Sequence, residues 1–226
     1  MVLAAVLLKL GGYGIIRMCP LYPPNTWLLY PVAATALWGI LMTGMICLRK
    51  TDLKALIAYS SVAHMGLVIV SALIQTPNST SAAVMLMVAH GLTSSMLFCL
   101  TNMLYERTNT RTLLSMRGMH NITPPLTNFW LFASLTNLAL PPTINFIGEI
   151  QIMTALFNWS PITITLTATG TIISAIYSLQ MFVNTQHGLL SKDSKEIYPA
   201  LERELLILML HGLPIALLTI NPQLII

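Results

Sequence analysis

The sequence predicts an all-α protein, a polytopic transmembrane helix bundle with about seven crossings. Only 8% of the 226 residues are charged, whereas soluble domains usually carry about 25%. The mean hydropathy is +0.75, which excludes a water-soluble globule. The apolar residues form blocks of roughly 18 to 25, long enough to cross a hydrocarbon core about 30 Å thick. These blocks lack the period-2 alternation of barrel strands, so each one is predicted to be a helix.

The distribution of basic residues supports the count of seven. We expect crossings at about residues 1–18, 26–48, 53–74, 82–104, 127–158, 162–186 and 205–220. If each block crosses once, three loops on one side hold most of the basic residues: Arg49, Lys50, Lys54, Arg107, Arg111, Arg117, Lys192, Lys195 and Arg203. The opposite side has only Arg17, and Lys9 lies inside the first block. The positive-inside rule predicts this asymmetry for a membrane protein.

The first crossing contains Gly11, Gly12 and Gly14, and we expect a discontinuous helix near Gly11-Gly12. Apolar residues follow Met1 directly, without the basic segment or cleavage site of a signal peptide. No cap or flanking loop precedes this crossing, so the chain resembles the interior of a longer membrane domain. We expect residues 1–226 to form a single membrane domain, without an internal repeat.

The fifth crossing, 127–158, is too long for one straight helix, because roughly 32 residues at about 1.5 Å each exceed the hydrocarbon core. Pro141 and Pro142 lie in its middle. Adjacent prolines remove two backbone donors and disfavour α geometry before them, so we expect two half-helices. Membrane proteins tolerate such breaks where they face protein or a wet cavity, and transporters keep ion sites there.

Four titratable residues lie within different apolar blocks: Lys9, His64, His90 and Glu149. The other acidic residues fall in the basic-side loops or at their edges: Asp52, Glu106, Asp193, Glu196, Glu202 and Glu204. A charged side chain at mid-membrane costs about 2.5 to 3.5 kcal/mol or more, so such residues are functional candidates. Together the four predict a proton relay, in which Tyr59, Ser60, Ser61, Thr93, Ser94 and Ser95 could hold water.

Structural roles stay open for each of these residues. A membrane histidine often joins helices as a neutral hydrogen-bonding group, and small hydroxyl residues often serve helix packing. The Lys9 ammonium could snorkel to the interface, and Glu149 could be a protonated, hydrogen-bonded carboxyl. We expect a structural role for His211, and we assign no role to His120 and His187.

Metal binding and nucleic-acid binding are not predicted. Cys19, Cys47 and Cys99 are widely separated, without CxxC spacing or a Cys/His cluster, and are expected to be small core residues. The formal charge is +4, but the basic residues are scattered over loops without aromatic interleaving.

Five segments carry a resemblance to a known family: LLKLGGYGIIR (7–17), TDLKALIAYSSVAHMGLV (51–68), MVAHGLTSSMLF (87–98), YERTNTR (105–111) and LPPTINFIGE (140–149). The chain resembles, from end to end, the antiporter-like subunits of respiratory complex I, a family that includes multisubunit cation/proton antiporters. Glu149, where several relatives carry Lys, and the His-Gly-Leu sequence at His90 favour one branch over its paralogues.

The resemblance implies a fold of fourteen crossings, built from two inverted five-helix repeats that each contain a broken helix. The chain would be the C-terminal half. Lys9 matches the lysine of the first broken helix, whose glutamate partner lies in an earlier helix that this chain lacks. His64 and His90 match the central relay histidines, and Glu149 matches the terminal residue that exchanges protons with the outer side.

The implied function is proton translocation within NADH:ubiquinone oxidoreductase, coupled to electron transfer from NADH to ubiquinone. NADH, FMN, iron-sulfur clusters and ubiquinone would be used by other subunits, because this chain has no Gly-rich nucleotide loop and no Cys cluster. The implied partners are other membrane subunits of complex I, including neighbouring antiporter-like subunits, and inner-membrane lipids. The implied location is the mitochondrial inner membrane, with the basic loops facing the matrix.

Two other readings compete with this function. A sodium/proton antiporter of the related multisubunit type would use the same buried lysine and glutamate for direct ion exchange. A structural membrane anchor would use the buried polar residues only to fix helix packing.

Overall fold

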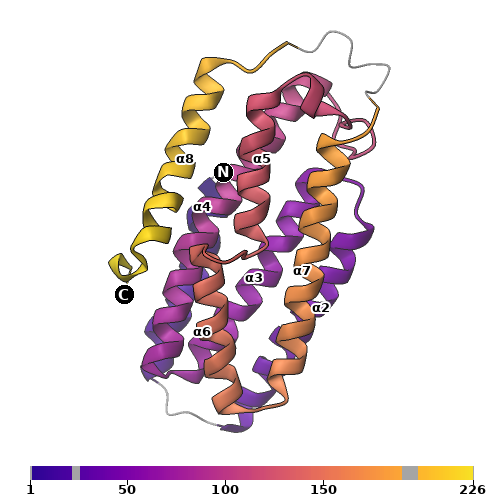
Figure 1. The fold of residues 1–226 in the computed structure, drawn as a ribbon. Helices are drawn as coiled ribbons and strands as arrows, with labels where there is room; N and C mark the ends of the chain where they lie inside the picture. The colour runs from indigo at the N-terminus through magenta and orange to yellow at the C-terminus, as the bar shows by residue number, and fades with distance from the viewer. Residues whose placement is uncertain (1, 22–25, 190–197, 226) are drawn as a thin grey trace.

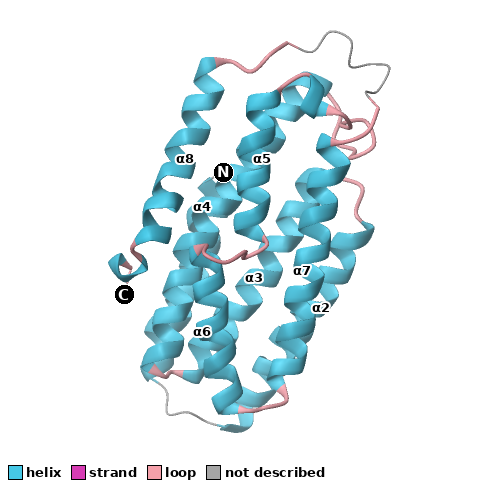
Figure 2. Cartoon of the chain, in the orientation of Figure 1, coloured by secondary structure: helices cyan, strands magenta, loops and turns pink. Residues whose placement is uncertain are grey.

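The computed structural model describes residues 2–21, 26–189 and 198–225. The elements are η1 (Leu3–Leu7), α1 (Leu8–Met18), η2 (Cys19–Leu21), α2 (Thr26–Arg49), α3 (Leu53–Ile74), α4 (Pro77–Thr108), η3 (Met119–Asn121), α5 (Pro124–Asn137), α6 (Ile144–Trp159), α7 (Thr163–Gln186), α8 (Glu202–Ile220) and η5 (Pro222–Leu224). These described ranges contain helices and no strand (Figure 2). The all-α prediction is confirmed.

Six helical segments of the described residues are long and apolar enough to cross a membrane: Leu3–Leu21, Leu29–Arg49, Leu53–Ile74, Pro77–Thr108, Thr163–Gln186 and Glu202–Ile220. The predicted fifth crossing is the pair α5 and α6, of 14 and 16 residues, which follow one another through the bundle (Figure 1). The connections α2/α3 and α4/α5, the end of α7 and the start of α8 lie toward the upper end in Figure 1. We call this end the basic face; Lys192 and Lys195 lie outside the described residues.

The predicted break at Pro141 and Pro142 is confirmed. Helix α5 ends at Asn137 and α6 begins at Ile144, with both prolines in the connection. The Asn145 side chain donates a hydrogen bond of 2.7 Å to the Thr136 carbonyl, which ties the two half-helices together. The same carbonyl also accepts from the Ala139 backbone N–H at 3.2 Å, so the backbone at the break has partners inside the protein, as irregular backbone at membrane depth requires.

The predicted break at Gly11-Gly12 is wrong, because α1 runs through both residues as one continuous helix. Glycine weakens a helix by about 1 kcal/mol but keeps its backbone N–H donor, so without proline the helix persists. Gly12 instead permits close packing, since a Cβ there would lie 2.7 Å from Met87 Sδ and 3.1 Å from Val68 Cγ1. The irregular stretch is the π-helix η1, just before Lys9.

Helix α4 occupies the middle of the bundle and packs against α3, α6, α8, α5 and the N-terminal helix. It extends beyond the predicted 82–104 at both ends. Thr76 and Ser79 form a reciprocal capping box around Pro77, which explains the early start in a polar stretch that hydropathy does not detect. Asn109, in the left-handed conformation, ends the helix.

The apolar core consists of two clusters. One lies toward the basic face and includes Leu100 and Trp130, and the other lies toward the opposite face and includes Leu86 and Ile152. Along α4 the two clusters are separated by a polar stretch of buried residues: His90, Thr93, Ser94 and Ser95. The fold therefore places a polar layer between two apolar halves.

Candidate functional site

The two membrane histidines meet between α3 and α4. The ring centroids of His64 and His90 lie 4.9 Å apart, and the ring planes are tilted by 35°. Both residues are buried, with exposed fractions of 3% and 1%. Since α3 and α4 are consecutive antiparallel helices, residues near their middles are brought to the same depth.

Glu149 reaches the histidines from α6. It lies in the second turn after the proline break and is buried. Its Oε1 atom lies 3.3 Å from His64 Nδ1, so the contact would be an ion pair if both ring nitrogens of His64 carried a proton. The preceding residue, Gly148, packs on α4: a Cβ there would lie 3.4 Å from the Leu86 backbone nitrogen, in ordinary van der Waals contact.

Lys9 lies at the side of this cluster. Its Nζ donates a hydrogen bond to the Ala4 carbonyl within the π-helix η1, and the residue is half-buried. A Cβ at Gly91, the residue after His90, would lie 3.7 Å from Lys9 Cε. The structure thus brings His90, His64 and Glu149 into contact and places Lys9 beside the chain neighbour of His90.

Several polar atoms in this region lack a protein partner. Among the described residues, His64 Nε2 and both ring nitrogens of His90 are buried without a hydrogen bond. Buried polar groups in proteins nearly always have a partner, which is ordered water where no protein group is available. The histidine pair is therefore chemically suited to hold water.

The nearby hydroxyls bond mainly within their own helices. Ser94 and Ser95 donate to the carbonyls three residues earlier, at 3.3 and 2.9 Å, and Ser60 does the same on α3. Tyr59 does not belong to the site: it is exposed, and the Lys50 ammonium lies 5.4 Å from its ring centroid. The His211 ring makes a hydrogen bond within α8, where Nδ1 lies 2.8 Å from the Ile207 carbonyl oxygen. This contact is consistent with the structural role expected for His211.

A second buried charge cluster was not predicted. Arg107 was assigned to the basic loops, but it lies in the last turn of α4 and its side chain is fully buried. It forms an ion pair with Glu204 and donates to the backbone carbonyls of Met103, Tyr198 and Pro199. The signal for a longer helix was Asn109, whose residue type favours a left-handed helix end.

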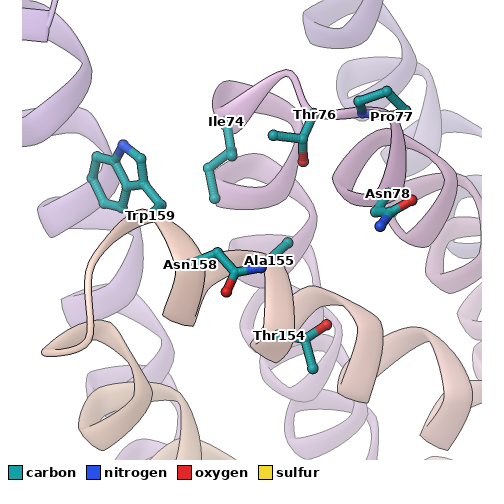
Figure 3. Close-up of a pocket in the computed structure, with 8 residues that line it drawn as sticks. All are labelled: Ile74, Thr76, Pro77, Asn78, Thr154, Ala155, Asn158 and Trp159. Atoms are coloured by element: carbon teal, nitrogen blue, oxygen red, sulfur yellow. The ribbon is translucent and has the colours of Figure 1, made fainter.

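A pocket of about 530 Å³ opens at the face opposite the basic face (Figure 3). It lies between the α3/α4 connection and the end of α6, and its lining residues are Ile74, Thr76, Pro77, Asn78, Thr154, Ala155, Asn158 and Trp159. Hydroxyl and amide groups from both sides make this pocket suitable for water.

Comparisons with known proteins agree with this architecture. A family described as "NADH:quinone oxidoreductase/Mrp antiporter, TM" matches residues 1–174. NADH-ubiquinone oxidoreductase chain 4 of Latimeria chalumnae is 56% identical over all of this chain and 49% of its own length. Chain 4 of Agkistrodon contortrix contortrix is 52% identical over all of this chain and 98% of that sequence.

Solved structures show the same fold. Respiratory complex I from Thermus thermophilus with bound NADH matches with 26% identity and a TM-score of 0.76, over 98% of this chain and 44% of that one. The Mrp complex from Dietzia matches with 13% identity and a TM-score of 0.84, over 96% of this chain and 49% of that one. The chain spans about half the length of the curated relatives first matched. It belongs to the family of transmembrane subunits of NADH:quinone oxidoreductases and Mrp antiporters.

Proposed function

We propose that this chain is the C-terminal, proton-translocating part of an antiporter-like membrane subunit of NADH:ubiquinone oxidoreductase. Lys9, His90, His64 and Glu149 form its relay. The observation that carries the proposal is the continuous buried contact from His90 through His64 to Glu149. These three residues come from three helices, and each of them can bind and release a proton.

The contact between His64 and Glu149 is suited to storing one proton. Both side chains can bind and release a proton, and the 3.3 Å between Glu149 Oε1 and His64 Nδ1 is short enough for a proton to be shared between them. When the proton leaves, the two side chains become a neutral ring beside a carboxylate. Moving one charge through 100 mV takes about 2.3 kcal/mol, which is within the strength of charge-assisted contacts in a buried site.

Water completes the path where side chains do not touch. The rings of His64 and His90 have three nitrogens without a protein partner, and Lys9 has no direct hydrogen bond to His90 within the described residues. Toward the opposite face, α6 leads from Glu149 to Ala155 at the pocket of Figure 3, about 9 Å along the helix axis. This supports Glu149 as the residue that exchanges protons with the outer side.

The proposal extends to the assembly and the location, and the names of the relatives support it. The redox cofactors belong to other subunits, and this chain binds none of its own. Its neighbours are other membrane subunits of the complex, including antiporter-like ones, and inner-membrane lipids. The basic face lies in the mitochondrial matrix, as the positive-inside rule favours.

Glu149→Gln tests the proposal in the full-length subunit of an assembled complex. We expect the protons translocated per NADH oxidised in sealed vesicles to fall sharply, because an amide cannot accept the relay proton. Glu202→Gln is the matched control, since Glu202 is an exposed carboxylate at the start of α8. Wild-type pumping by Glu149→Gln would contradict the relay. Sodium-dependent pH gradients formed without NADH would instead favour a sodium/proton antiporter.

A further inference from the structure

An apolar groove runs between α1 and α2. Both helices pack on α3, which forms the floor of the groove at Met65 and Gly66. The walls come from α1, between Leu8 and Ile15, and from α2 at Gly39. The groove has a volume of about 390 Å³, and none of the residues that line it has a polar side chain. It offers water no hydrogen bond, so it is suited to hydrocarbon.

Glycines give the groove its shape. A Cβ at Gly66 would lie 2.7 Å from Ile40 Cγ1, so this glycine lets α2 lie directly on α3. At Gly11 and Gly39, by contrast, a Cβ would meet nothing within 4 Å. The walls are bare helix backbone at these two positions, and a larger side chain there would occupy the groove itself.

The groove lies at the depth of the acyl chains of one leaflet. Its α3 residues, from Val62 to Ile69, lie about 8 to 18 Å along the helix axis from Ile74, where α3 ends at the face opposite the basic face. One leaflet contributes about 15 Å to a hydrocarbon core about 30 Å thick. An acyl chain in the groove therefore belongs to a lipid whose headgroup lies at this opposite face.

Arg17 supplies a positive charge at the level of that headgroup. It is exposed in the last turn of α1, just beyond Ile15 of the groove wall. It forms no ion pair with a described residue, and no carboxylate of the described residues lies at this face. A guanidinium binds phosphate through two parallel hydrogen bonds, and its long stem can extend to the headgroup level. The charge of Arg17 is therefore complementary to a phosphate from outside the chain.

We propose that this groove binds one phospholipid of the leaflet at the opposite face, with an acyl chain between α1 and α2 and its phosphate on Arg17. In the proposed longer subunit, the preceding half meets α1 on the side of Lys9. Leu8 and Ile15 project about 100–120° around the helix from Lys9, so the groove faces another side and stays open to lipid. The inference rests on the proposed function for this placement of α1, but not on the relay.

The lipid is tested by electron cryo-microscopy of the assembled complex, with the full-length subunit, in nanodiscs of phosphatidylcholine that carries brominated acyl chains. We expect bromine density in the groove and a phosphate oxygen within about 2.7–3.2 Å of an Arg17 guanidinium nitrogen. A groove that holds no ordered lipid, that a protein side chain fills, or whose lipid has its phosphate away from Arg17 overturns the proposal. Lipid density does not depend on pumping, so this result is separate from that of Glu149→Gln.

Two variants test whether the groove and the charge hold the lipid. Brominated phosphatidylcholine is titrated into the detergent-solubilised complex, and bromine density in the groove is measured. We expect Arg17→Gln to raise the concentration that half-fills the groove about fivefold, the factor for one arginine at a phospholipid headgroup. Gly39→Leu should remove the density, because the new side chain occupies the groove.

Ala34→Leu is the matched control for Gly39→Leu, since Ala34 is exposed on the same helix and does not line the groove. It should bind lipid like the parent protein. If Gly39→Leu and Arg17→Gln also bind like the parent, neither the groove nor the arginine selects a lipid and the proposal is wrong.

Discussion

The buried ion pair between Arg107 and Glu204 holds α8 against α4, and replacing Arg107 with Met should release it. The arginine side chain is fully buried, and the pair joins the last turn of α4 to the first turn of α8. Glu204 would keep one partner, the Leu201 backbone N–H at 3.1 Å, but would lose its counterion. Breaking a buried pair by removing one partner costs about 3–5 kcal/mol.

The cost corresponds to a shift of about 150- to 4,000-fold in the equilibrium between docked and undocked α8. A reporter cysteine in place of Leu208 measures it, because Leu208 is a fully buried residue of α8. We expect maleimide labelling of this cysteine in the assembled complex to accelerate by about the same factor when opening and closing are fast. Arg107→Lys should give an intermediate rate, because an ammonium cannot reproduce the guanidinium fork.

Arg49→Met is the control, since Arg49 is exposed at the end of α2. It should label at the rate of the parent protein. If Arg107→Met also labels at that rate, the ion pair does not hold α8 in place and the reasoning from burial is refuted.

Three further predictions concern packing. Gly12→Ala should destabilise the bundle by about 1–3 kcal/mol through overpacking, whereas Gly14→Ala, with open space at the new methyl, should be neutral or slightly stabilising in the same thermal-unfolding assay. Half-buried Cys19 should react with a thiol reagent in the native protein well before buried Cys47, and equal rates would contradict the packing of α2. Asn145→Asp removes the amide N–H that donates to the Thr136 carbonyl across the helix break. It should lower the free energy of unfolding by about 1–3 kcal/mol in the same assay.

The fold was largely predictable because its causes are local in sequence. Block length and polarity determine which segments cross, and Pro141 with Pro142 determines where the fifth crossing breaks. The ends of α4 were missed because capping by Thr76 acts through hydrogen bonds that a hydropathy window does not contain. The expected break at Gly11-Gly12 failed because glycine alone removes no backbone donor.

The candidate site was predictable only in part. The cost of burying ionisable groups indicated His64, His90 and Glu149 without indicating their partners. The contact between His64 and Glu149 joins residues on α3 and α6, which are far apart in sequence, so it depends on how these helices pack. Likewise, Arg107 looked like a loop residue because its burial arises from the chain around 198–204, far along the sequence.

The most direct test of the relay compares His64→Gln, Glu149→Gln and the double variant in one assembled complex, by protons translocated per NADH oxidised. Residues that act in series on one path are strongly non-additive, because blocking either one already stops the flow. The relay therefore predicts a double variant that is no worse than the more severe single variant. Two independent losses that add in the double variant would contradict it.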